Sequence, residues 1–129
     1  MHNHELEERL LEFSVRCTKL CRALPTSRYY DADHVAKQLL RAATHAGFHY
    51  PEARSAESTR DFLHKLKVLL KELREARAEL RYIQRMEYLT PDRVAPLIRE
   101  SGELVAMFTA GTKKLSAKMV QKAEASKAG

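Results

Sequence analysis

The sequence predicts an all-α protein, folded as an antiparallel up-down-up-down four-helix bundle. Three observations carry this prediction. Gly and Pro number only four each in 129 residues and Trp is absent, which is typical of a helical composition. Apolar residues recur at alternating spacings of four and three, as on one face of a helix. The connections between these stretches are short, which makes consecutive helices antiparallel neighbours.

The longest helix is expected at residues 59–89. Ser58 and Asp61 resemble a capping box, no Gly or Pro interrupts the stretch, and Thr90-Pro91 ends it. Because its apolar stripe runs along the whole helix, we expect the other helices to pack against it. The stripe contains Phe62, Leu66, Leu69, Leu73, Ala76, Leu80 and Ile83.

The first two helices are expected at residues 5–23 and 31–50. The first has the same four-three spacing and ends just before a proline. The second begins at Asp31, a favourable N-cap, and presents a face of small residues rich in alanine. Gly47 weakens this helix and Pro51 should end or kink it, so its exact end is expected between Gly47 and Arg54.

The fourth helix is expected at residues 91–119. Pro91 occupies its first position, where a missing N–H costs nothing, and Pro96 should bend its first turns. Residues 1–119 would then form one bundle domain. Residues 120–129 carry too little apolar surface to offset the entropy of ordering, so we expect a basic, disordered tail.

Composition also bounds the class of protein. No stretch approaches the uncharged apolar length that a membrane span needs, and the N-terminus lacks a leader pattern, so we expect a soluble, cytoplasmic protein with no membrane partner. Cys17 and Cys21 are expected to be buried free thiols. The formal net charge is +6, and most of the imbalance comes from five lysines and one glutamate after residue 112.

The helix at 59–89 separates its charges by sign on a wheel of about 100° per residue. Leu63 and Leu70 fall inside the basic sector, outside the core stripe, which predicts that they are exposed and form an interface. The basic sector contains Lys67, Lys71, Arg74, Arg77, Arg81 and Arg85. The acidic sector contains Asp61, Glu72, Glu75 and Glu79.

These sectors allow three interpretations. They can be a solvated surface with intrahelical pairs such as Lys71 with Glu75. They can instead join copies of the chain, with the acidic side of one subunit against the basic side of the next in a closed ring. The contact would then contain Leu63, Leu70, Glu72, Glu75 and Glu79.

The third interpretation is phosphate binding by the basic sector, which is compatible with ring assembly if only some arginines are buried. Tyr82 and Tyr88 lie near this sector and offer planes for stacking on unpaired bases. The full set of expected nucleic-acid contacts is Lys67, Lys71, Arg74, Arg77, Arg81, Arg85, Lys113, Lys114 and Lys118.

Catalytic and cofactor patterns are missing from the sequence. It has no nucleophile elbow, no phosphate-binding glycine loop and no Cys/His zinc pattern. His45 and His49 have the spacing of a helical metal pair, but position 46 is alanine and no third ligand is obvious beyond Glu52. We therefore expect no catalytic residue, no metal and no cofactor, and a protein that is not an enzyme.

Several motifs, in this order, carry a family resemblance over about residues 6–115. They are Leu24-Pro25, Gln38-Leu39, Arg41-Ala42-Ala43, Ser58 before Asp61-Phe62, Tyr88-Leu89-Thr90, Leu97-Ile98, Glu100, Gly102 and Phe108. On these motifs the sequence resembles the small bacterial four-helix bundle proteins encoded within intervening sequences of 23S ribosomal RNA genes. It is also similar to the related accessory proteins of diversity-generating retroelements.

One stretch departs from that family. Relatives often carry SIPANIAEG at the end of the second helix, and residues 45–53 here read HAGFHYPEA. The stretch keeps Glu52 but has His49 in place of the asparagine and Ala53 in place of the final glycine.

The resemblance implies a non-enzymatic, cytoplasmic bundle that assembles as a ring, commonly a homopentamer, with a basic surface for nucleic acid. It also implies a protein or RNA partner, a reverse transcriptase or ribosomal RNA. We therefore expect an oligomeric accessory or adaptor subunit that binds RNA or DNA largely independently of sequence. The alternative is a protein-interaction scaffold whose charged flanks serve ring assembly only.

Overall fold

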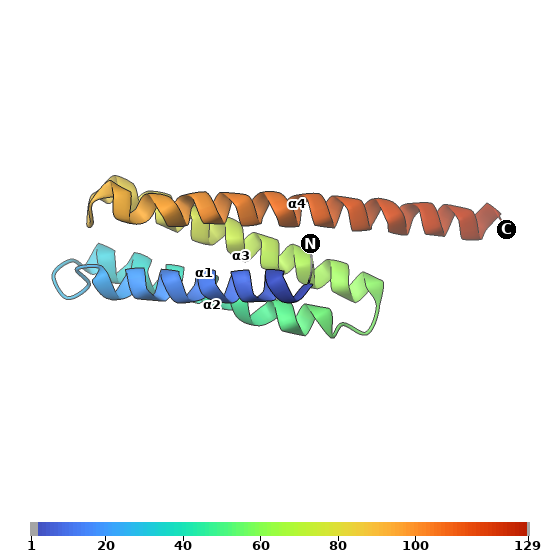
Figure 1. Cartoon of the computed structure of the whole chain (residues 1–129), viewed down its shortest axis with the longest axis horizontal. Helices are drawn as coiled ribbons and strands as arrows, with labels where there is room; N and C mark the ends of the chain where they lie inside the picture. Colours follow the sequence, from blue (N-terminus) through green and yellow to red (C-terminus); the bar gives the residue numbers. More distant parts are fainter. Residues whose placement is uncertain (1–2, 129) are drawn as a thin grey trace.

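The computed structural model describes residues 3–128, and within them the chain forms four helices. They are α1 (Asn3–Ala23), α2 (Tyr30–Arg54), α3 (Thr59–Met86) and α4 (Pro91–Ala128). Each helix contacts the next along the chain, and α1 also contacts α4. The helices run alternately up and down (Figure 1), which confirms the predicted all-α bundle. Positions 1, 2 and 129 lie outside the described residues.

The start of α3 is capped as predicted. The Ser58 hydroxyl oxygen accepts a hydrogen bond from the Asp61 backbone N–H at 3.0 Å. The helix ends at Met86 rather than at the expected residue 89, because Glu87 adopts a left-handed conformation with φ of 56°. A residue in this conformation terminates a helix without requiring proline.

Helix α2 continues through Pro51 to Arg54, four residues beyond the approximate bound of 50 and at the far limit of the range expected for its end. Tyr50 and Ala53 are buried in the core, so packing on both sides of Pro51 stabilises the last turn. Gly47 permits the close approach of α1, because a Cβ there would lie 2.1 Å from the Ser14 Oγ atom. The Ser14 hydroxyl donates a hydrogen bond to the Ala43 carbonyl oxygen at 2.6 Å.

Helix α4 continues to Ala128, whereas we expected helix only to residue 119 and a tail without fixed structure. Figure 1 shows it projecting beyond the ends of the other three helices. Residues 120–128 are exposed throughout, so their helicity follows from local preference for Ala, Lys, Glu and Gln rather than from packing. None of the helices described at positions 3–128 is both long and apolar enough to cross a membrane.

The core confirms the predicted stripe of α3, with six of its seven members buried and Phe62 half-buried. Leu63 and Leu70 are also buried, at 8% and 5% exposure, so the prediction that they are exposed is wrong. Helix α3 packs between α2 and α4, so its buried arc is wider than a single stripe facing one neighbour. The exposure that suggested an interface at these leucines is therefore absent.

Candidate nucleic-acid interface

The outer surface of α3 carries a row of exposed cations, here called the α3 basic stripe. Its members span about 27 Å along the helix at 1.5 Å per residue. They are Lys67, Lys71, Arg74, Arg81 and Arg85, all exposed. The cations that form ion pairs within residues 3–128 are different ones, namely Arg9, Lys37, Arg41, Arg54 and Lys65. The stripe is therefore positive charge that no described carboxylate compensates.

Arg77 differs from the other predicted contacts on α3 because it packs against α4. A Cβ on Gly102 would lie 3.4 Å from the Arg77 Nε atom, and that nitrogen is buried without a hydrogen-bond partner. Arg77 also borders a surface hollow of about 780 Å³ together with Arg16 and Arg99. Arg77 is thus held over the α4 backbone, at the edge of the stripe rather than on it.

The lysines of α4 continue the basic surface. The Arg74 Nη2 atom lies 3.4 Å from the Thr109 hydroxyl oxygen, which sets the antiparallel register of α3 and α4. Lys113 follows Thr109 by one helical turn, on the side of α4 that Thr109 occupies. Lys113, Lys114 and Lys118 are all exposed.

The acidic sector of α3 faces α2 within the same subunit. Arg41 of α2 lies 3.3 Å from a Glu72 carboxylate oxygen and 2.8 Å from one of Glu75. These two carboxylates already have a partner inside the chain. Arg41 of the same chain therefore already neutralises two of the carboxylates that the predicted contact between subunits would use.

Glu79, the third glutamate of that sector, is desolvated. Its Oε1 atom is buried and has no hydrogen-bond partner. Burial raises the pKa of Glu79 from 4.5 to about 7, and the neighbouring Glu75 carboxylate raises it as well. Arg41 opposes both effects without cancelling them. The sequence gives no signal of this, because the burial comes from α2 packing across α3.

Glu79 lines a depression between α2 and α3, here called the α2–α3 hollow. Its volume is about 350 Å³. The Tyr82 ring stands at its edge, 45% exposed. Tyr88 donates a hydrogen bond from its hydroxyl to the Asp31 carboxylate. The hollow is lined by Asp31, His34, Val35, Gln38, Ala78, Glu79 and Tyr82.

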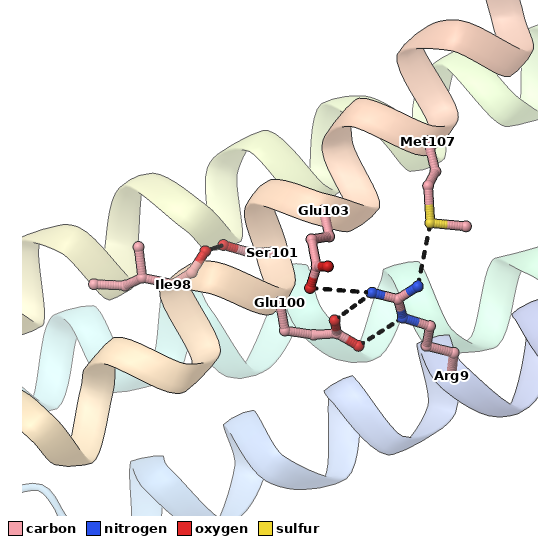
Figure 2. A network of polar contacts seen from close by, with 6 residues as sticks. All are labelled: Arg9, Ile98, Glu100, Ser101, Glu103 and Met107. Carbon is pink, nitrogen blue, oxygen red and sulfur yellow. Dashed lines mark hydrogen bonds and ion pairs between the residues drawn. The ribbon is translucent and has the colours of Figure 1, made fainter.

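A polar network joins α1 to α4 away from the stripe (Figure 2). Arg9 of α1 donates from Nε and Nη2 to both carboxylate oxygens of Glu100, at 2.9 and 2.6 Å. Its Nη2 also lies 3.4 Å from Glu103, and its Nη1 lies 3.3 Å from the Met107 sulfur. This hydrogen bonding holds the pKa of Glu100 below its usual value. The network joins α1 to α4, the pair with the least backbone contact among the helix pairs that touch.

An apolar surface on α1 and α2 was missed by the sequence analysis. Phe48 is 61% exposed and stands beside a shallow groove of about 240 Å³ between the two helices. The signal was present, because Leu11 and Val15 fall outside the four-three spacing of the first helix. We call this surface the α1–α2 apolar face. It comprises Leu11, Val15, Leu40 and Phe48, all exposed.

The remaining candidate groups show packing rather than reactive chemistry. Cys17 is buried, as predicted, and Cys21 is half-buried. Burial raises the pKa of Cys21 to about 11 and also raises that of Cys17, so both remain thiols near neutral pH. The His45 and His49 rings stack with centroids 4.8 Å apart. In the region from 3 to 128, no group of three or more His, Cys, Asp or Glu side chains is placed to hold a metal ion.

Comparisons with known proteins agree on one group of relatives. A family model described as 23S rRNA-intervening sequence protein matches residues 3–110. The chain is also similar to the crystal structure of a protein with unknown function from the S23 ribosomal protein family of Bacteroides thetaiotaomicron. That match has a TM-score of 0.74 at 30% sequence identity and covers 83% of this chain and 97% of the other. No curated protein matches the sequence.

Proposed function

Because the chain belongs to the 23S rRNA-intervening sequence protein family, we propose that it is a non-catalytic, cytoplasmic accessory subunit that binds RNA or DNA through the α3 basic stripe. The observation that carries this proposal is the uncompensated charge of the stripe. Its five cations are exposed and none of them forms an ion pair with a described carboxylate, while two glutamates of the same helix are held by Arg41. A row of exposed cations without ion-pair partners along one helix favours binding to a polyanion.

The stripe is better suited to binding the sugar-phosphate backbone of a nucleic acid than to recognising its base sequence. Phosphate contacts by Lys and Arg supply affinity without sequence information. The stripe lies along the side of α3 rather than at a helix end that could enter a groove, so binding should depend mainly on charge. The lysines of α4 extend the contact as secondary sites.

The first test is the salt dependence of binding, measured by fluorescence anisotropy with labelled single-stranded RNA and with duplex DNA. Five phosphate contacts predict a slope of log affinity against log salt of about −3.5 for the single strand and about −4.5 for the duplex. Affinity should then fall roughly hundredfold for the single strand when salt rises from about 50 to about 200 mM. A slope near zero would overturn the proposal.

A second candidate function is a protein-interaction scaffold built by self-assembly. It is favoured by the α1–α2 apolar face, which leaves an aromatic ring in solvent on an otherwise charged surface. Exposed acids, Glu8 and Glu12, lie at one end of this face, and exposed cations, Lys19 and Arg22, lie at the other. A second copy of the chain offers both signs to match them. This contact replaces Leu63 and Leu70 as the proposed site of assembly.

The two candidate functions assign different roles to self-assembly. In the first, a ring of subunits, five by the family resemblance, multiplies the basic stripes that face nucleic acid, such as ribosomal RNA. In the second, assembly presents the bundle to a protein partner such as a reverse transcriptase. Mass measurement tests assembly, and the salt titration tests the use of the stripe.

A further inference from the structure

The α2–α3 hollow is large enough to hold one planar ring. Its volume of about 350 Å³ lies at the lower end of the range for small-molecule sites, roughly 300–1,000 Å³. Val35 and Ala78 supply apolar walls. Tyr82 stands at the edge with nearly half of its surface exposed, so an incoming ring can stack on it.

The polar part of the hollow combines two carboxylates with three groups that can also donate, namely His34, Gln38 and the Tyr82 hydroxyl. Glu79 and Asp31 both line it, and Gln38 adds an amide. The Asp31 carboxylate already accepts from the Tyr88 hydroxyl. Glu79 lines the hollow, and its Oε1 atom is buried with no described donor, which costs free energy. Rotation of the carboxylate toward the hollow would let that oxygen accept a hydrogen bond from a ligand. A ligand that donates N–H bonds therefore stabilises the site, whereas one that presents only carbonyl oxygens does not.

The hollow adjoins the α3 basic stripe. On a helix with about 100° per residue, Tyr82 lies between the stripe and Glu79. Arg81 immediately precedes Tyr82, and Arg85 lies one turn after it on the stripe. A nucleotide whose phosphate contacts these arginines has its base beside the Tyr82 ring.

We propose that the α2–α3 hollow binds one unpaired nucleobase that carries an exocyclic amino group, with the base stacked on Tyr82 and its amino edge toward Glu79. The inference rests on the proposed nucleic-acid function and names the feature of the strand that the protein selects. Cytosine, adenine and guanine donate from an amino group, and carboxylates accept from the amino group of cytosine. Uracil and thymine place two carbonyl oxygens around a single N–H, and these oxygens are repelled by the Glu79 carboxylate once it is ionised, above its pKa of about 7.

An arginine or lysine side chain of a protein partner would also satisfy Glu79. The surroundings disfavour it, because the chain carries a net charge of +6 and the stripe lies next to the hollow. A basic peptide would meet repulsion that a phosphate backbone does not. The apolar walls and the exposed ring also fit a planar base better than an ammonium group.

The test is an anisotropy titration of the full chain with short oligocytidine and oligouridine strands of equal length at the same salt. At about pH 8, above the pKa of Glu79, wild type should bind oligocytidine more tightly by about ten- to a hundredfold, the value of one hydrogen bond to a charged acceptor. Glu79→Gln should abolish this preference, since an amide donates as well as accepts. The matched control is Glu5→Gln, which changes an exposed carboxylate on α1 and should keep the preference.

Two further variants separate base binding from a change in folding. Ala78→Phe places a large side chain in the hollow from an exposed position and should reduce oligocytidine affinity to that of oligouridine. Tyr82→Ala should weaken both strands by roughly tenfold through lost stacking. Its control, Tyr30→Ala, removes a ring that is 90% exposed and does not line the hollow. Circular dichroism melts confirm that each variant is folded.

The outcomes separate the inference from the proposed function. If wild type binds both strands equally and with a steep salt slope, the hollow does not select a base and the inference is overturned while the function stands. If the preference survives in both Glu79→Gln and Ala78→Phe, the base is read elsewhere and the inference is also overturned. If wild type binds neither strand, both proposals fail; binding of a lysine-rich peptide that Ala78→Phe abolishes would then assign the hollow to a protein partner.

Discussion

Arg41 of α2 binds Glu75 of α3, with its Nη2 atom 2.8 Å from a carboxylate oxygen. The same guanidinium reaches Glu72 one turn earlier. This contact decides how the charges of α3 are used, because it joins two carboxylates of the acidic sector to their own subunit. The basic sector has no such partner among the described residues, so the helix presents a net positive ridge to solvent.

Replacement of Arg9 by alanine should destabilise the bundle by about 1–2 kcal/mol, since it removes a bidentate ion pair with the largely buried Glu100 carboxylate. Urea denaturation measures the loss. Lys19→Ala removes an exposed cation of the same helix and should leave the free energy of unfolding unchanged. Equal effects of the two variants would mean that the α1–α4 network contributes nothing beyond surface charge.

Glu79 should make the folded state less stable as pH rises. Its folded pKa of about 7 lies above its ordinary value of 4.5, so the folded chain binds more protons than the unfolded chain between these values. Stability from this group is complete below about pH 4.5 and is lost as pH rises through about 7. Glu79→Gln should therefore stabilise the protein more at about pH 8 than at about pH 5.

Urea denaturation of wild type and Glu79→Gln at both pH values measures this difference. Comparison of the two proteins cancels the opposite contribution of Glu100, whose pKa is lowered and whose stabilisation is lost on acidification. A stability difference that does not change with pH would contradict the raised pKa of Glu79.

Two glycine-to-alanine substitutions should have opposite effects. Gly47→Ala would place a Cβ 2.1 Å from the Ser14 Oγ atom and 3.3 Å from the Leu10 carbonyl oxygen, so we expect a loss of about 1–3 kcal/mol from overpacking. Gly111→Ala meets nothing within 4 Å on α4 and should gain about 0.5–1 kcal/mol from helix preference. Thermal melts of both variants check the contrast. The double change of Gly47 and Ser14 to alanine should recover part of the loss.

Phe48→Glu should prevent self-assembly if copies of the chain meet through the α1–α2 apolar face. Light scattering on the wild type should give several times the protomer mass of 14.8 kDa, and five times that mass for the ring proposed from the family resemblance. The variant should give one protomer mass. Tyr30→Glu changes an even more exposed ring outside the face and should keep the assembly. A wild-type monomer at micromolar concentration would rule out this contact.

Sequence spacing was sufficient for the α3 stripe and its Ser58 cap, because both depend on residues close together in the chain. It failed at Leu63 and Leu70, since a helical wheel does not show that α4 covers that side of α3. The pairs Arg9–Glu100 and Arg41–Glu75 join different helices, and nothing local selects them over intrahelical partners. The early end of α3 depends on the left-handed conformation of Glu87. Glutamate rarely adopts this conformation, so the residue type alone does not predict a helix end there.

The most direct test of the proposed function reverses three charges on the α3 basic stripe. In Lys71→Glu/Arg81→Glu/Arg85→Glu, affinity for single-stranded RNA at low salt should fall at least roughly hundredfold, and the salt slope should lose about two units. The control, Lys19→Glu/Lys122→Glu/Lys127→Glu, makes the same change in net charge at exposed positions outside α3 and should bind nearly as wild type. Equal losses in the two folded variants, or no loss in the first, would contradict binding through the stripe.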